Sequence, residues 1–313
     1  MHHYLIKRTA YLILTLVIAS MFTFVVVNAT PGEPAEVLAR HLYIGLEEVA
    51  PPELIAEVSE RYDLNKPLLQ QYLEWVGGIL HGDLGYSILF NKPVDRLLML
   101  HLPPTILLTA VAMSFATIAG LVLGIYSALH LNKISDHIIR VGTIFSVSMP
   151  GFWVAVMLIL VFSIWLGLTP VSGYGGPQYI ILPAIALGLH TMASIIRIMR
   201  TSMLETMDKP FVTFAKAKGL PMRRVICSHA CKNAFLPVLT VIGMSFGALL
   251  AGSVVIETIF SWPGIGAMLM KAISARDLVL IESTIMVIVF MFLIVNFVID
   301  LLYHVIDPRI TYE

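Results

Sequence analysis

Long stretches without a charged side chain divide this chain into segments. Asp, Glu, Lys and Arg are all absent from residues 9–32, 97–132, 141–196, 233–256 and 283–299. A helix needs about 20 apolar residues to cross the hydrocarbon layer of a bilayer. The third stretch is long enough for two crossings, and its turn-rich middle at 168–177 divides it. We therefore predict six membrane-spanning helices, at 9–28, about 103–127, two within 141–196, about 236–257 and about 280–302.

The composition indicates an all-α integral membrane protein. Of the 313 residues, 58% are apolar and only 13% are charged, whereas soluble proteins carry about 25% charged residues. Helices satisfy every backbone polar group without water, as a bilayer requires. Lys and Arg together number 20, as do Asp and Glu, so the overall charge gives no indication of nucleic-acid binding. Two cysteines exclude a disulfide scaffold.

The distribution of basic residues predicts the orientation. Cytoplasmic loops carry an excess of Lys and Arg. The loop 197–235 holds eight of them, and the loop 168–180 between the third and fourth helices holds none. We therefore place both termini in the cytoplasm. The first helix follows Lys7 and Arg8, but its apolar run of about 20 residues exceeds that of a signal peptide, so we expect an uncleaved anchor.

The predicted helices divide the chain into three parts. Residues 1–28 hold an N-terminal tail and the first helix, 29–100 form an extracytoplasmic segment, and 101–313 form a core with the other five helices. Two amphipathic helices are expected in the extracytoplasmic segment, one starting at Pro51-Pro52 and continuing to Tyr62, the other running from Pro67 to Leu80. The segment is either a small folded cap or a docking surface for an extracytoplasmic partner.

The cytoplasmic loop 197–235 is predicted to contain a compact helix. Residues 211–221 combine small side chains on one side with a stop at Gly219. A second helical piece, 222–233, leads into the fifth crossing. A compact helix of this kind can insert into a groove on another protein. On the outer side, residues 257–266 contain a proline and two glycines and are expected to turn back at the membrane surface.

Short motifs occur in a fixed order along the whole chain. They are Pro31-Gly32-Glu33-Pro34-Ala35, Asp63-Leu64-Asn65-Lys66-Pro67-Leu68, Gly82-Asp83-Leu84-Gly85-Tyr86-Ser87, Leu102-Pro103-Pro104-Thr105, Ser148-Met149-Pro150, Ala215-Lys216-Ala217-Lys218-Gly219, Asn233-Ala234-Phe235-Leu236-Pro237, Phe260-Ser261-Trp262-Pro263-Gly264-Ile265-Gly266, Arg276-Asp277 and Asp307-Pro308-Arg309-Ile310. In this order they resemble the permease subunits of ATP-binding-cassette (ABC) importers for dipeptides, oligopeptides and nickel.

The resemblance implies a fold and a set of partners. It implies the type I ABC importer permease fold in a prokaryotic cell membrane, and a heterodimer with a second similar permease. It further implies two ATP-binding subunits and an extracytoplasmic substrate-binding protein. The ATPase-coupling helix would consist of Thr213, Phe214, Ala215, Lys216, Ala217, Lys218 and Gly219.

Two departures from the family pattern stand out. Thr213 and Phe214 occupy the positions where importers commonly have Glu and Ala, so the usual acidic contact to the ATPase is missing. We expect Ala215 and Gly219 to allow close backbone approach, with Lys216 and Lys218 supplying charge. The second departure follows Arg276-Asp277, where Leu278-Val279 replace the family's aromatic residue and proline.

No residue pattern on this chain predicts catalysis or cofactor binding. A glycine-rich phosphate-binding loop ending in Lys-Ser/Thr is absent from the sequence, so we assign ATP and Mg²⁺ to the partner subunits. Cys227, His229 and Cys231 resemble a metal cluster, but on a helix His229 points about 200° away from Cys227. No serine, histidine or metalloprotease arrangement within a span indicates an intramembrane enzyme.

Four ionisable residues are candidates for the outer gate or the pathway. His190 lies inside the fourth predicted span, Glu257 and Asp277 lie at the outer surface, and Glu282 lies at the start of the sixth span. Ionisable residues in membranes are functional candidates by default. Helix packing for His190, and pairing with Arg276 for the two outer acids, are the structural alternatives.

The substrate and the energy source have alternatives. The short outer turn at 173–183 resembles that of nickel permeases, so we favour nickel or a nickel chelate over di- or oligopeptides. A stand-alone secondary transporter or channel is a more distant alternative. It would need charged residues in mid-membrane, and the spans within 103–127, 141–167 and 181–196 have none.

Overall fold

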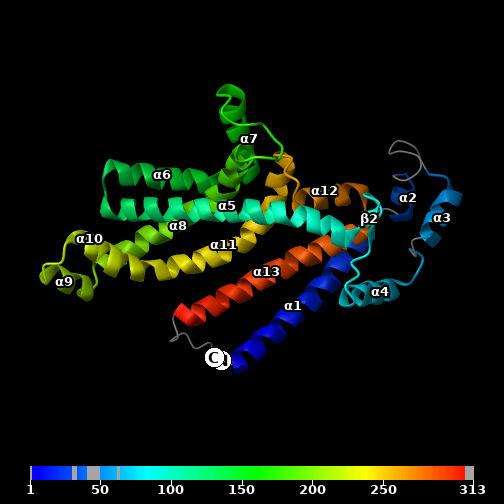
Figure 1. The fold of residues 1–313 in the computed structure, drawn as a ribbon, viewed down its shortest axis with the longest axis horizontal. Coiled ribbons are helices and arrows are strands. Elements are labelled where there is room, and N and C mark those ends of the chain that lie inside the picture. The colour runs from blue at the N-terminus through cyan, green and yellow to red at the C-terminus, as the bar shows by residue number, and fades with distance from the viewer. Residues whose placement is uncertain (1, 30–33, 41–49, 62–63, 307–313) are drawn as a thin grey trace. The chain divides into compact units, whose positions relative to one another are not determined.

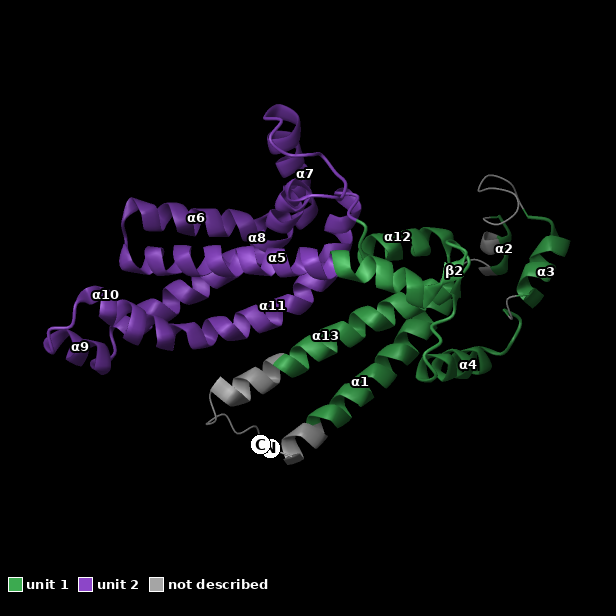
Figure 2. Cartoon of the chain, viewed as in Figure 1, with its two compact units in different colours: residues 1–104, 263–313 green, residues 105–262 purple. Residues whose placement is uncertain are grey.

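The chain forms two compact units, which Figure 2 colours separately. Unit 1 comprises residues 1–104 and 263–313, and unit 2 comprises residues 105–262. The computed structural model describes residues 2–29, 34–40, 50–61 and 64–306. Most of these residues are helical, as expected for a chain that satisfies its backbone hydrogen bonds within each membrane segment.

Five long helices and one bent pair correspond to the predicted crossings (Figure 1). The long helices are α1 (His2–Asn28), α5 (Val94–Leu129), α8 (Pro177–Met207), α11 (Cys231–Ile259) and α13 (Leu278–Ile306). The pair consists of α6 (Ile134–Ser148) and α7 (Gly151–Leu158), which a π-helical segment extends over Ile159–Trp165. Their length and apolar composition suit a membrane. The described residues thus confirm the all-α class with five to six spanning helices.

The third crossing is sharply bent, which the pattern of charges did not indicate. The axes of its two parts differ by 111°. Proline disfavours the helical conformation for the residue before it, and Met149, which precedes Pro150, has an extended backbone with φ −90° and ψ 133°. The straight helix expected within 141–167 is therefore two helices. The first of them begins earlier than expected, at Ile134.

The predicted extracytoplasmic segment contains short helices and a hairpin. The helices are α2 (Pro34–Ala39), α3 (Pro52–Arg61) and α4 (Leu68–Leu80). They include both predicted amphipathic helices, although Tyr62 lies outside the described residues. Strands β1 (Tyr86–Ser87) and β2 (Lys92–Pro93) pair antiparallel, with Ser87 opposite Lys92. Helix α5 begins directly after β2, so residues 94–100, the end of the predicted extracytoplasmic segment, form the first turns of a long helix.

Unit 1 is built on α1, α13 and the short helix α12 (Ile265–Ala275). Helices α1 and α13 run side by side (Figure 1). Helix α4 packs on α1 through the rings of Phe24, Tyr72 and Trp75, with the centroids of Phe24 and Tyr72 5.4 Å apart. The Ser20 and Tyr72 hydroxyls lie 2.9 Å apart and share a hydrogen bond. On the exposed side of α4, a hydrogen bond from the Lys66 ammonium lowers the pKa of Glu74.

Unit 2 is built on α5, α8 and α11, and close helix contact is possible because of glycine. A Cβ atom added at Gly120 of α5 would lie 2.6 Å from Ile195 Cγ2 of α8, and one at Gly124 would lie 2.8 Å from Met199 Cβ. These distances are too short for real side chains, so the two helices approach each other through bare backbone. Gly120 and Gly124 form the G-x-x-x-G pattern common at membrane helix interfaces.

The remaining elements of unit 2 connect α8 to α11. Helix α9 (Pro210–Ala217) follows α8, and α10 (Met222–Arg224) with the π-helical segment Val225–Ala230 leads into α11. Figure 1 shows α9 and α10 at the end of unit 2 that lies away from α7. The expected short helix and the expected second helical piece are therefore both present.

Candidate functional site

Helix α9 has a defined start and a defined end. Pro210 occupies the first helical position, where its missing N–H costs no hydrogen bond. At the other end Gly219 has φ +77°, a left-handed conformation that glycine adopts without steric cost. The Gly219 N–H bonds to the Lys216 carbonyl over 3.0 Å, and the Leu220 N–H bonds to the Ala215 carbonyl over 3.4 Å. This pattern is a Schellman motif, so Gly219 ends the helix as predicted from sequence.

One face of α9 holds it against the rest of unit 2. Val212 and Ala215 are buried together with Val225, and Met207 and Leu220 pack against them. Ala215 is only 5% exposed, so its backbone is not available for the close approach to a partner that we expected. The physical reason is that Val212 and Ala215 are three residues apart and share the face that anchors the helix.

The opposite face of α9 is exposed to solvent. The Phe214 side chain is 62% exposed, and Thr213, Lys216, Ala217, Lys218 and Gly219 are exposed as well. The Lys218 ammonium lies 4.7 Å from the centroid of the Phe214 ring, within the range of a cation–π interaction. An exposed aromatic ring beside a basic group is typical of an interaction surface. We call Thr213, Phe214, Ala217 and Lys218 the docking face.

A buried ion pair ties α8 to the first turn of α6. The Arg200 Nε and one terminal nitrogen each donate to a different oxygen of Asp136, both over 2.8 Å. The Ser127 hydroxyl also bonds to Asp136, and the Asn132 N–H donates to it over 3.1 Å. Asp136 is fully buried, and such a charge is tolerated only when it is paired and hydrogen bonded. The pair therefore fastens the first turn of α6 to α8.

Sequence reasoning missed the Asp136–Arg200 pair. The two residues are 64 positions apart, and each reads separately as a loop charge near the end of a span. The one available signal is Asn132, which has φ +60° and, in a sequence, favours a tight turn before a helix. That signal predicts the turn but not the partner of Asp136.

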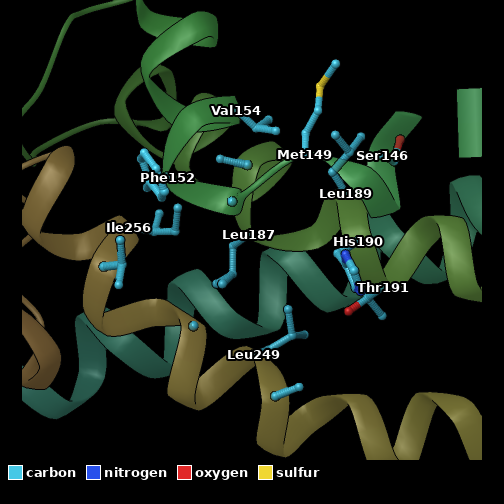
Figure 3. A pocket seen from close by; sticks show the side chains of 15 residues that line it. Ser146, Met149, Phe152, Val154, Leu187, Leu189, His190, Thr191, Leu249 and Ile256 are labelled. Atoms are coloured by element: carbon cyan, nitrogen blue, oxygen red, sulfur yellow. The ribbon is translucent and has the colours of Figure 1, made fainter. Parts of the chain in front are cut away.

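A pocket with a volume of about 360 Å³ lies within unit 2 where α6 meets α7. Figure 3 shows it between the Met149–Phe152 segment, α8 and α11. His190 and Thr191 project from α8 at its edge. His190 is exposed, and its ring makes no hydrogen bond or ion pair with any described residue. Of the four candidate ionisable residues, His190 is the one that lines this pocket.

Asp277 lies inside unit 1. It is 1% exposed. Its carboxylate accepts hydrogen bonds from the Ser87 hydroxyl over 2.7 Å, from the Leu89 N–H over 3.0 Å and from the Leu280 N–H over 3.2 Å. Asp277 therefore caps the start of α13 and holds the β1–β2 hairpin. Asp277 thus has a structural role in unit 1, and its part in the outer gate stays a prediction.

The other two acids are buried as well. Glu257 is fully buried and accepts a hydrogen bond from the Thr105 hydroxyl over 2.6 Å. Glu282 is 5% exposed and accepts one from the Asn28 side-chain amide over 3.2 Å. Both carboxylates are thus hydrogen bonded within the protein, and their part in the outer gate or pathway stays a prediction. Among the described residues, no group of three His, Cys, Asp or Glu side chains could hold a metal ion.

The family assignment rests on both halves of the chain. Residues 120–312 match the family described as "Binding-protein-dependent transport system inner membrane component". Residues 1–109 match the description of the N-terminal part of such membrane components. The chain belongs to this family. It is therefore a multi-pass permease of the bacterial plasma membrane and a subunit of an ABC transporter rather than an enzyme, and its family implies ATPase and substrate-binding partners.

Full-length relatives place the chain among permeases of the peptide importer family. It is 37% identical to the di/tripeptide transport system permease DppB of Pseudomonas aeruginosa, with 99% of each chain covered. It is 36% identical to the dipeptide transport system permease DppB of Escherichia coli K12, with 100% of each covered. A putative peptide transport system permease of Brucella abortus is 34% identical, with 99% of each covered. These relatives do not support our preference for nickel.

Proposed function

We propose that this permease forms half of the translocation pathway of an ATP-driven importer of di- or oligopeptides. The observation that carries the proposal is the likeness over the full chain to permeases named for dipeptide and di/tripeptide transport. Peptide import, our alternative from sequence, thus replaces nickel as the favoured function. The second half of the pathway would come from a homologous permease, and an extracytoplasmic binding protein would deliver the peptide.

Energy would enter through the docking face of α9. Two ATP-binding subunits would hold ATP and Mg²⁺, and each would receive a short helix from one permease. In this chain Phe214 and Lys218 are the exposed groups best suited to contact a groove on the ATPase, because a large ring buried at an interface contributes most to binding. The anchored face with Val212 and Ala215 would make α9 move together with the permease.

The route from α9 to the pocket is a single stiff helix. Helix α8 carries His190 near its middle and Arg200 closer to its end, and α9 follows directly. Arg200 lies seven residues before the end of α8 at Met207, about 10 Å along the helix. The Asp136–Arg200 pair fastens α6 to α8, and both helices line the pocket. A displacement of α9 would therefore shift two pocket walls together, as in rigid-body alternating access.

Reconstitution of the complete transporter tests the substrate. The two permeases, the ATPase subunits and the binding protein are inserted into liposomes, and ATP hydrolysis and uptake are measured with a dipeptide and with Ni²⁺. We expect the dipeptide to stimulate hydrolysis and to accumulate. Stimulation by Ni²⁺ alone would contradict the peptide assignment and restore nickel.

The same liposomes test the energy source. Vesicles that contain this permease without ATPase subunits should accumulate no peptide, because we assign ATP hydrolysis to those subunits. Accumulation by the permease alone would instead support the stand-alone transporter.

A further inference from the structure

The pocket beside the α6–α7 bend has features that suit a passing peptide. Its volume of about 360 Å³ lies at the lower end of the range for small-molecule sites. Its lining is mainly apolar, and it contains no Asp, Glu, Lys or Arg. The residues that matter for the inference come from α7, α8, α11 and the bend that precedes α7: Met149, Gly151, Phe152, His190, Thr191 and Gly252.

His190 indicates that the open side of the pocket does not face lipid. It lies in the part of α8 between Pro177 and Arg197, which has no charged residue and would cross the hydrocarbon layer. A polar group exposed to hydrocarbon without a partner costs several kcal/mol. The His190 ring is exposed and makes no hydrogen bond with any described residue. It therefore needs water, a substrate or another subunit beside it.

We propose that this pocket is a transient binding site for a peptide during its passage, in which the apolar walls accept a side chain and His190 hydrogen bonds to the peptide backbone. The inference rests on the proposed function, because it takes the substrate to be a peptide. A neutral imidazole can donate to a peptide carbonyl or accept from a peptide N–H. A site without a full charge binds weakly enough to release its cargo, as transport requires.

The Ser148-Met149-Pro150 motif gains a role in this proposal. Pro150 produces the 111° bend, and the bend opens the space that Met149, Gly151 and Phe152 line. A Cβ atom added at Gly151 meets nothing within 4 Å. Packing therefore does not require glycine at position 151. The missing side chain instead leaves room in the pocket.

Gly151 therefore allows a direct test. Complete transporters with Gly151→Ala, Gly151→Val or Gly151→Phe are compared in proteoliposomes for uptake of Ala-Ala and Phe-Phe, each relative to the unmodified transporter. We expect Gly151→Phe to lower Phe-Phe uptake about tenfold more than Ala-Ala uptake, since apolar pockets discriminate side chains by factors of this order. Gly142→Phe is the matched control, because an added Cβ there also meets nothing within 4 Å and Gly142 does not line the pocket.

Two results would overturn the inference. Equal loss of both peptides, or no loss, in the Gly151 series would show that no peptide side chain enters the pocket. Failure of the second permease to co-purify with Gly151→Phe would show that the neighbouring subunit fills it. If instead the unmodified transporter takes up neither peptide, the proposed function itself fails.

His190 provides a second and independent readout. His190→Leu should lower uptake of both peptides by a similar factor, because the imidazole contacts the backbone that all peptides share. His190→Gln keeps a donor and an acceptor and should restore most of the uptake. Equal uptake by the Leu variant and the unmodified transporter would contradict the role of the imidazole.

Discussion

The docking face of α9 and the junction around Asp277 belong to motifs of equal prominence in the sequence, yet the fold uses them in opposite ways. At the junction, a carboxylate that is 1% exposed accepts hydrogen bonds from Ser87, Leu89 and Leu280. On α9, the Phe214 ring is 62% exposed and lies beside the Lys218 ammonium. The first region has buried and satisfied a polar group, and the second exposes an apolar one.

This difference separates residues that hold the fold from residues that meet a partner. Around Asp277, residues from separate sequence motifs contact one another. A Cβ atom at Gly85 would lie 2.5 Å from Val279 Cγ1, and the Ser283 hydroxyl donates to the Leu84 carbonyl over 2.9 Å. The Gly82–Ser87 motif therefore fastens the hairpin to the start of α13. On α9, by contrast, the Phe214 ring is 62% exposed even with the Lys218 ammonium over it, as expected of a surface that a partner would cover.

The largest effect is expected from Asp277→Ala. The substitution leaves three donors without an acceptor, and each buried unpaired group costs about 1–3 kcal/mol, so a loss of about 3 kcal/mol or more is expected. It should appear as a much lower thermal midpoint of the purified complex. The fraction that remains folded should hydrolyse ATP and transport in the usual ratio. A changed ratio with unchanged thermal stability would make Asp277 a pathway residue after all.

Phe214→Ala should have the next largest effect, and a different one. An aromatic ring at the centre of an interface contributes about 2 kcal/mol or more to binding. We expect weaker co-purification of the ATPase subunit and about a 30-fold loss of uptake, while the thermal midpoint of the isolated permease stays the same. Lys216→Ala is the control on the same helix, because Lys216 is exposed but lies two residues from Phe214 and therefore on another face of α9. Equal effects of the two substitutions would contradict the docking face.

Much of the fold was predictable because the bilayer imposes one length on every crossing. The charge-free stretches contain the apolar parts of α1, α5, α8, α11 and α13. The bend before α7 was not predicted, although Met149-Pro150 carries its signal. The pattern of charges reports where lipid begins, and it contains no information about backbone direction. The early start of α6 was missed because the first part of this helix carries charged residues, Asp136 and Arg140, and lies outside the charge-free stretch.

In the candidate site, the sequence could predict only those features that neighbouring residues determine. The end of α9 at Gly219 follows from residues next to each other in the chain, and the sequence predicts it correctly. The exposure of each α9 side chain depends on which face is anchored, and the spacing of Val212 and Ala215 could have indicated that face. The hydrogen bonds of Asp277 and Asp136 join residues 190 and 64 positions apart. No local pattern shows such partners.

Gly219→Leu should have a moderate effect confined to the docking region. A non-glycine residue in the left-handed conformation costs roughly 1–2 kcal/mol, and space itself is no obstacle because an added Cβ meets nothing within 4 Å. We expect the membrane helices to fold normally and the end of α9 to be distorted, so that ATP hydrolysis continues while peptide uptake falls. Gly219→Asn, which tolerates this conformation better, should show a smaller loss. Unchanged transport by the Leu variant would mean that the docking helix lies elsewhere.

Ser87→Ala should have the smallest effect and gives the finest test of the comparison. It removes one of the three hydrogen bonds to Asp277 and leaves those from Leu89 and Leu280 in place. It also removes the hydrogen bond that Ser87 Oγ accepts from the Phe90 N–H over 3.2 Å. Each lost hydrogen bond costs about 1 kcal/mol, so the thermal midpoint should fall less than in Asp277→Ala. The number of peptides imported per ATP hydrolysed should not change, since the hydrogen bonds of Asp277 hold the hairpin and α13 together. If that ratio fell at an unchanged thermal midpoint, burial and hydrogen bonding would no longer distinguish the structural residues of this permease from those that act in transport.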